Sequence, residues 1–181
     1  MIILVPLKEK LIPVDRKAMD LLYAQMKADL EFSKLMTIPA RSLPRYRFLV
    51  LGELPRALRN SSLLDIIKIT IESSSLNYNP FFSMTGSKVT AFFAYRIESN
   101  IITDIKTFSL QDSPNGVLAK DLIFFIKDNR SKYYSIEWDA LKENPANDQY
   151  LKVLRMFTNP NAEPDIEGHI LHYRIPGLKK A

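Results

Sequence analysis

The sequence has 181 residues, of which 46% are hydrophobic and 25% charged, as is typical of one globular domain with a substantial core. Its formal net charge is +5 and it has no cysteine, which excludes disulfides, thiolate metal sites and a cysteine nucleophile. The apolar run at residues 1–7 is too short for a signal peptide, and no window reaches the roughly 18 apolar residues of a membrane span. We therefore expect a cytoplasmic protein without membrane association.

The first half of the chain predicts a strand followed by helices. Residues 1–7 are typical of a strand, and residues 45–53 of a strand or extended stretch. Apolar side chains recur at helical spacing over residues 15–35, where Asp15 can cap the first turn. Residues 62–73 favour a helix with a capping arrangement at its start, although the isoleucines in this run are also common in strands.

The second half predicts a strand meander followed by alternating helices and strands. Strands are expected at residues 80–85, 88–97, 100–110, 133–141 and 168–177, and helices at 114–127 and 144–157. The short turns after residues 85 and 97 predict antiparallel neighbours. Together these elements predict an α/β fold with a mixed, mostly antiparallel central sheet and helices on both faces. A ligand in such a sheet tends to lie where neighbouring strands diverge, beside a helix N-terminus.

The turn before the first of these helices reads Ser113-Pro114-Asn115-Gly116-Val117-Leu118. It resembles the loop of the GNAT superfamily of acyl-CoA-dependent N-acyltransferases, where Arg/Gln-x-x-Gly-x-Gly/Ala backbone amides hold the CoA pyrophosphate. Gly116 matches that motif, whereas Ser113 and Leu118 depart from it. The residues alone equally fit a plain corner, with Ser113 as a cap and Pro114 at the first helical position. The resemblance covers roughly residues 80–176 of what we expect to be a single domain, and residues 1–79 then form its variable acceptor side.

The resemblance implies a seat for acetyl-CoA between the fourth and fifth strands of the family's sheet. Pantetheine would pair with the backbone of Phe108, Ser109 and Leu110, the pyrophosphate would lie on the amides from Asn115 to Leu118, and Asn144 would contact the cosubstrate. Tyr150 would protonate the departing thiolate, because a phenol can donate a proton to this leaving group. The other interpretation of Tyr150 is an amphipathic helix residue with its ring against the core.

Asp104 is the candidate proton acceptor for the amine. An acid in the middle of so apolar a strand needs a partner or a function, and the family sometimes places a carboxylate here. The alternative is an ion pair with Arg96 across the hairpin. Glu137 and Asp139, on the next strand, are weaker candidates for the same role.

The two histidines, His169 and His172, are expected to lie on one strand, facing opposite sides, with a structural role. They are too few for a histidine-rich metal site, and we expect no metal.

The sequence therefore predicts an N-acetyltransferase that uses acetyl-CoA to acetylate an amine of unidentified type. It does not determine the oligomeric state, and a homodimer is possible. One alternative is a non-catalytic protein of the same fold that binds CoA or a protein partner. A second is a nucleic-acid-associated protein using the basic stretch of Arg41, Arg45, Arg47, Arg56 and Arg59.

Overall fold

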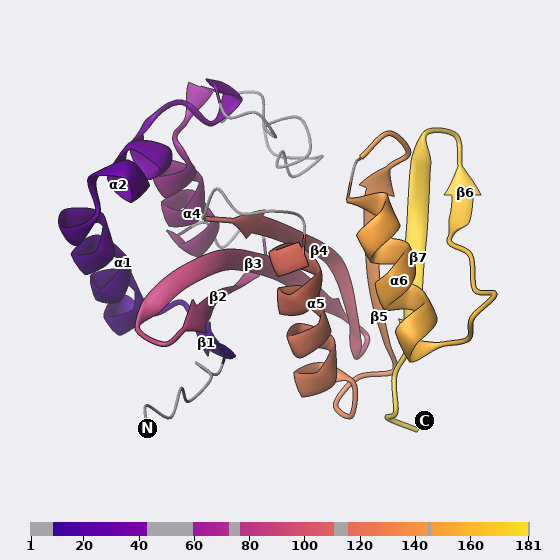
Figure 1. Cartoon of the computed structure of the whole chain (residues 1–181). Coiled ribbons are helices and arrows are strands. Elements are labelled where there is room, and N and C mark those ends of the chain that lie inside the picture. The colour runs from indigo at the N-terminus through magenta and orange to yellow at the C-terminus, as the bar shows by residue number, and fades with distance from the viewer. Residues whose placement is uncertain (1–8, 43–59, 73–76, 111–115, 145, 181) are drawn as a thin grey trace, which may run out of the picture.

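The computed structural model describes residues 9–42, 60–72, 77–110, 116–144 and 146–180 (Figure 1). The strand predicted at residues 45–53 and most of the basic stretch lie outside these ranges. The first strand that the structure describes is β1 (Glu9–Pro13), and the strand predicted at residues 1–7 lies outside the described residues. No helix among the described residues is both long enough and apolar enough to cross a bilayer.

The predicted helix over residues 15–35 is two helices, α1 (Arg16–Ala28) and α2 (Leu30–Thr37). The cause is Asp29, whose backbone is extended and whose carboxylate accepts a hydrogen bond of 3.1 Å from the Phe32 amide. An aspartate that caps the next helix in this way competes with continuation of the preceding one. The cap predicted at Asp15 is confirmed by a bond of 2.9 Å from the Ala18 amide.

The third helix and the meander were predicted correctly. Helix α4 (Leu63–Glu72) follows a short 3₁₀ turn, η1 (Ala40–Ser42), and Ser62 caps it by accepting from the Asp65 amide. Strands β2 (Asn79–Thr85), β3 (Lys88–Glu98) and β4 (Ile101–Ser109) then pair in antiparallel hairpins. The second hairpin turn uses Ser99 and Asn100, both at positive φ, as tight hairpin turns require.

The remaining elements alternate, as the sequence predicts. They are α5 (Gly116–Asn129), β5 (Ser135–Leu141), α6 (Asn147–Phe157) and β7 (Ile170–Pro176). A short exposed strand, β6 (Asp165–Glu167), was not predicted. The sheet has seven strands in the order β1-β2-β3-β4-β5-β7-β6, and β4–β5 is its parallel pair. The predicted mixed, mostly antiparallel sheet is therefore confirmed.

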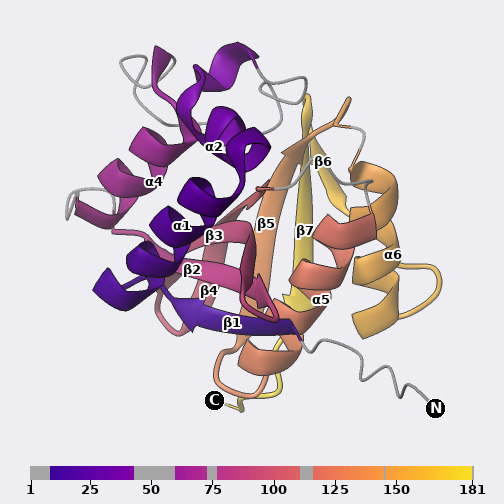
Figure 2. The same ribbon diagram turned by 60° about the vertical axis from the view of Figure 1, so that its left-hand side comes forward.

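Helices cover the two faces of this sheet (Figures 1 and 2). On one face, α1, α2 and α4 pack over the meander, around Leu22, Ile67 and Phe92. On the other, α5 and α6 pack over β3, β4, β5 and β7, around Phe93, Phe125 and Tyr173. Each cluster buries many apolar side chains, and this burial drives the docking of the helices. The predicted cover on both faces is confirmed.

Candidate functional site

The main feature of the site is the place where the parallel strands β4 and β5 stop pairing, here called the opening. Along their described lengths these strands pair at two positions, Ile101 with Ser135 and Ile102 with Ile136. Beyond them β4 stays paired with β3, and β5 stays paired with β7. The two strands therefore part toward their carboxyl ends while each keeps a rigid neighbour. Divergent strands in an open sheet are a common place for a ligand.

A β-bulge on β4 marks the start of this opening. Between the pairs Ala94–Lys106 and Arg96–Thr103, β4 has one residue more than β3. Asp104 lies in this irregularity at φ 54°, a left-handed conformation that aspartate adopts more readily than most residues. The bulge bends β4 at the level where it leaves β5.

The edge of β4 that faces β5 has backbone groups to offer a ligand. The Leu110 amide donates to the Thr90 carbonyl over 2.9 Å, so Leu110 directs its amide toward β3. Alternate residues of an antiparallel strand direct their backbone groups to opposite sides, which turns those of Ser109 and Thr107 toward β5. An extended chain could pair with this edge as an added strand. Leu110 itself is buried in the core.

Tyr150 extends from α6 to the β4 side of the opening. Its ring packs edge-on against Trp138 and Tyr173, and its hydroxyl shares a hydrogen bond with the side chain of Thr107. Burial raises the pKa of the Tyr150 hydroxyl, and the bond with Thr107 opposes this only in part. Tyr150 is thus both a core residue, as one interpretation predicted, and a protonated hydroxyl beside β4.

Trp138 lies on β5 beneath Tyr150. Its ring stacks on Tyr173 with centroids 5.1 Å apart, and 3% of the residue is exposed. Its indole Nε1 is buried and has no hydrogen-bond partner among the described residues. A buried donor of this kind costs stability unless a partner arrives, so a ligand carbonyl would satisfy it.

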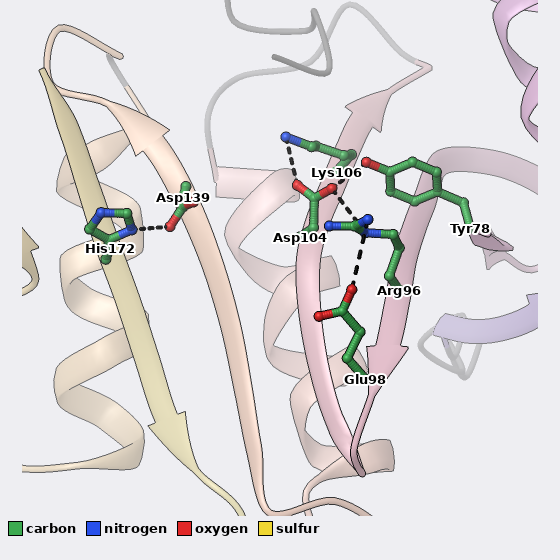
Figure 3. Close-up of polar contacts among 7 residues, drawn as sticks. All are labelled: Tyr78, Arg96, Glu98, Asp104, Lys106, Asp139 and His172. Carbon is green, nitrogen blue, oxygen red and sulfur yellow. Dashed lines mark hydrogen bonds and ion pairs between the residues drawn. The ribbon is translucent and has the colours of Figure 1, made fainter. Parts of the chain in front are cut away.

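Asp104 lies within a cluster of charges on the face away from α5 and α6 (Figure 3). Its carboxylate accepts from Lys106 Nζ at 2.9 Å, faces Arg96 Nε at 3.5 Å, and accepts a hydrogen bond from the Tyr78 hydroxyl. The ion pair with Arg96 that the sequence offers as an alternative is therefore present. A pocket of about 480 Å³ adjoins the cluster, with Tyr78, Arg96 and Glu98 in its lining.

These contacts set the protonation of Asp104. Burial alone would raise the pKa of its carboxyl, but the hydrogen bonds from Tyr78 and Lys106 and the charges of Lys106 and Arg96 outweigh it. The pKa is consequently held below its ordinary value. A carboxylate so stabilised is a weak proton acceptor at neutral pH.

A second polar group lies on the same face, across the opening. Asp139 on β5 contacts His172 Nδ1 on β7 at 2.5 Å, and His172 Nε2 contacts Glu167 on β6 at 2.9 Å. Figure 3 shows Asp139 opposite Asp104 and Lys106. The hydrogen bonds that His172 donates to the two carboxylates raise its pKa. The sequence did not predict this row because it depends on a register between residues more than 30 positions apart.

The histidines are arranged differently from the prediction. His172 lies on β7, but His169 precedes that strand and its carbonyl accepts from the Lys142 amide over 2.7 Å. The two therefore do not share a strand. The reason is the turn at Gly168, which has a φ of 60° and separates β6 from β7.

The predicted cosubstrate loop is described in part. Ser113 and Asn115 lie outside the described residues, whereas Gly116, Val117 and Leu118 form the first turn of α5. Phe108 and Ser109 end β4, as expected. The first amides of a helix lack intrahelical partners and attract anions, so the backbone of this turn suits a phosphate in principle.

Asn144 lies in the turn between β5 and α6. Its side-chain oxygen accepts from the Ala146 amide over 2.9 Å, and its own amide donates to the Leu141 carbonyl over the same distance. Asn147 supports the same turn: its amide nitrogen donates to the Leu141 and Lys142 carbonyls. Hydrogen bonds of two asparagines thus stabilise the turn that precedes α6, the helix on which Tyr150 lies.

Asp121, in the second turn of α5, is a further polar residue that the sequence analysis missed. The residue is 1% exposed, and its carboxylate accepts from the Ser83 hydroxyl on β2 over 2.7 Å. This contact fixes α5 over the sheet. Its signal in the sequence was one acid on the apolar side of a predicted helix.

Within the described ranges, no group of three or more histidine, aspartate or glutamate side chains is placed to hold a metal ion. The basic stretch proposed for nucleic acid falls mostly at residues 43–59, outside the described part of the chain.

No protein-family model and no curated protein matches the sequence, whereas solved structures match the fold. An aminoglycoside N(6′)-acetyltransferase from Legionella pneumophila superposes with a TM-score of 0.55 at 10% identity, over 95% of this chain and 94% of that one. A spermidine N-acetyltransferase from Vibrio cholerae, in complex with CoA and spermine, gives 0.55 at 12% identity, over 94% and 96%. The GNAT domain of Streptomyces lividans PAT gives 0.53 at 13%, over 93% and 90%.

Proposed function

The chain has the fold of the GNAT superfamily, and from this premise we propose that it is an N-acetyltransferase that moves the acetyl group of acetyl-CoA to an amine by direct attack. One observation carries the proposal. Where β4 and β5 stop pairing, a protonated tyrosine hydroxyl, that of Tyr150, contacts Thr107 on β4. An opening with a proton donor at its side is what thioester cleavage requires.

The cosubstrate seat follows from the backbone of β4 and α5. Pantetheine would pair with the β5-facing edge of β4 in the Phe108, Ser109 and Leu110 segment, where Ser109 presents its amide and carbonyl. The pyrophosphate would bind the amides at the start of α5, from Asn115 through Gly116 and Val117 to Leu118, with Ser113 beside them. Asn144 would complete the seat from the β5–α6 turn.

The chemistry needs an unprotonated amine and a proton for the thiolate. The amine nitrogen attacks the thioester carbonyl, a C–N bond forms, and the C–S bond breaks. Tyr150 donates its proton to the departing sulfur, and burial suits it to this role because it keeps the phenol protonated at neutral pH. None of these steps involves a metal ion.

Asp104 was predicted as the proton acceptor, and that role stays a prediction. Its contacts with Lys106, Arg96 and Tyr78 favour a different task. We assign Asp104 to holding the bulge, because its hydrogen bonds with Tyr78 and Lys106 and its ion pair with Arg96 link the residues just before β2 to β3 and β4 where β4 bends.

The structures with a similar fold support the reaction and leave the acceptor open. One acetylates an aminoglycoside and one spermidine, according to their descriptions, and each shares no more than 12% of its residues with this chain. Identity this low transfers the fold rather than the substrate. We therefore define the acceptor by chemistry, as a primary amine.

The test is thiol release from acetyl-CoA in the presence of primary amines. The panel is an Nα-acetyl-lysine amide, an alanine tripeptide, butane-1,4-diamine and an aminoglycoside, each corrected for hydrolysis without amine. We expect one class to accelerate thiol release and to yield an acetylated product by mass spectrometry. Acetyl-CoA binding with no release for any amine would favour the non-catalytic alternative and contradict the proposal.

A further inference from the structure

The row Asp139–His172–Glu167 has no part in the function proposed above. It crosses three adjacent strands in the order β5, β7, β6, from the rim of the opening to the edge of the sheet. The exposed fraction of its side chains is 53% at Asp139, 35% at His172 and 82% at Glu167. The row thus connects the opening to solvent through hydrogen-bonded titratable groups.

Position distinguishes Asp139 from the other carboxylates of the sheet. Ile102 and Ile136 are the last paired residues of β4 and β5. Asp139 lies three residues beyond Ile136, and because both strands rise by about 3.3 Å per residue, it lies at the same height along the sheet as the β4 segment that holds Asp104 and Lys106. Figure 3 shows Asp139 at this level on β5, with its carboxylate turned toward His172 on β7. Tyr150 approaches the same part of β4 from the opposite face, through its bond with Thr107. A thioester in the opening would therefore have Tyr150 on one face and Asp139 on the other.

The surroundings of the two acids assign them different roles. Asp104 is 17% exposed and held by two cations, whereas Asp139 is half exposed and its described partner is a histidine. An amine that approaches from the open face meets Asp139 without displacing an ion pair to lysine or arginine.

We propose that Asp139 is the catalytic residue that receives the acceptor's ammonium group and takes its proton, and that His172 is the positioning residue that orients Asp139 and passes the proton toward Glu167 and solvent. This inference rests on the acetyl transfer proposed above. It names the acceptor as an amine that arrives as a cation, such as a lysine-type or polyamine nitrogen.

The protons balance over one turnover. The ammonium nitrogen loses two protons as it becomes an amide. One proton leaves through Asp139 and His172 to solvent. The other replaces, over the whole turnover, the proton that Tyr150 gives to the thiolate. The nitrogen–carbon bond forms as the carbon–sulfur bond breaks, and no oxidant or reductant is involved.

Other charged groups face His172 and must be counted in its titration. Asp165 on β6 is its cross-strand neighbour, and Arg174 lies two residues along the same face of β7. Glu137 on β5 forms an ion pair with Arg174 at 3.7 Å, so Glu137 serves as the matched control for Asp139. It is a carboxylate on the same strand and the same face as Asp139, with a cross-strand cation, two residues nearer the closed end.

The experiment compares Asp139→Asn, His172→Gln and Glu137→Gln in the full chain. We measure kcat/KM against pH for the most active amine of the panel, and for a second amine of different basicity. Asp139→Asn is expected to lower kcat/KM by about 10²-fold at neutral pH, the usual contribution of a positioned acid or base. The loss should shrink as pH approaches the amine's own pKa, near 10.4 for a lysine-type nitrogen and near 8 for an α-amino group. His172→Gln should shift the pH at which kcat/KM rises, and Glu137→Gln should leave the profile unchanged.

Three other results would overturn the inference, and each has a different cause. If Asp139→Asn keeps the wild-type profile while the wild type turns over, Asp139 is not the acceptor and the acetyl transfer stands. An equal loss in Asp139→Asn and Glu137→Gln would mean a general effect of acidic charge, and would also contradict the assignment. If no amine releases thiol from the wild type, the proposed function fails and the inference fails with it.

Discussion

The Tyr150 hydroxyl and the Thr107 side chain share a hydrogen bond that joins α6 to β4, although β4 and β5 have parted. The bond holds a buried, protonated phenol beside the part of β4 that no longer pairs with β5. It relates the fold to the chemistry proposed for it, because the same residue packs the core and faces the opening.

Replacement of Tyr150 by phenylalanine tests its role as proton donor. The ring keeps its packing on Trp138 and Tyr173, so the protein should fold. We expect kcat to fall by about 10²-fold with little change in KM for acetyl-CoA, since the proton is needed in the transition state. The control is Tyr173→Phe, which removes a buried hydroxyl bonded to Asn147 and should retain most of the activity. Equal rates for the two variants would remove the assignment.

Two substitutions of Asp104 separate its charge from its backbone conformation. Asparagine tolerates the left-handed φ of 54°, so Asp104→Asn removes only the charge between Arg96 and Lys106. We expect it to lower the unfolding free energy by about 1–3 kcal/mol, the usual cost of losing a partner of charged groups. Asp104→Ala should be less stable still, because alanine is strained at this φ. Urea unfolding measures both, and an Asp104→Asn variant of full stability but without amine-dependent turnover would restore Asp104 as the proton acceptor.

The pH dependence of stability tests the row through His172. The hydrogen bonds to Asp139 and Glu167 raise its folded pKa, so their stabilisation is fully present below the ordinary value of about 6.5 and is lost as pH rises through the raised one. His172→Gln should therefore destabilise the protein more near pH 6 than near pH 9. The measurement is the melting temperature of the wild type and of His172→Gln across this pH range. A difference in melting temperature that does not vary with pH would contradict the stabilising role of His172.

Trp138→Phe tests whether the buried indole nitrogen meets a ligand. Its N–H has no partner among the described residues, so a bound acetyl-CoA carbonyl that accepts from it would gain about 1 kcal/mol. We expect Trp138→Phe to weaken acetyl-CoA binding about fivefold while kcat changes little. Unchanged affinity would show that the indole has a packing role alone.

Much of the fold could be predicted because its signals are local. The strands of the meander are apolar runs bounded by short turns, these turns contain residues that adopt positive φ, and the helices α5 and α6 have clear apolar stripes. The helix over residues 15–35 was predicted wrongly as one element because a single capping aspartate, Asp29, outweighed the periodicity. The strand β6 was missed because its three residues are all exposed and carry no apolar pattern.

The site was less predictable because its geometry is not local. Tyr150 was found through the family resemblance, but its bond with Thr107 depends on how α6 docks on the sheet. The row from Asp139 to Glu167 needs the registers of β5, β7 and β6, which no spacing within one segment encodes. The roles predicted for Ser113 and Asn115 remain predictions, because these residues lie outside the described ranges.

The most direct test of the central claim is calorimetric titration of acetyl-CoA into the protein, with dephospho-CoA and ATP as controls. Trp138, the sole tryptophan, gives a second readout beside Tyr150 through its fluorescence. We predict micromolar binding of acetyl-CoA, weaker binding of dephospho-CoA, none of ATP, and a thermal stabilisation equivalent to about 2.7 kcal/mol at a hundredfold excess over Kd. Absence of heat, of a fluorescence change and of stabilisation would mean that the opening between β4 and β5 is not an acetyl-CoA site, and would contradict the enzyme proposed here.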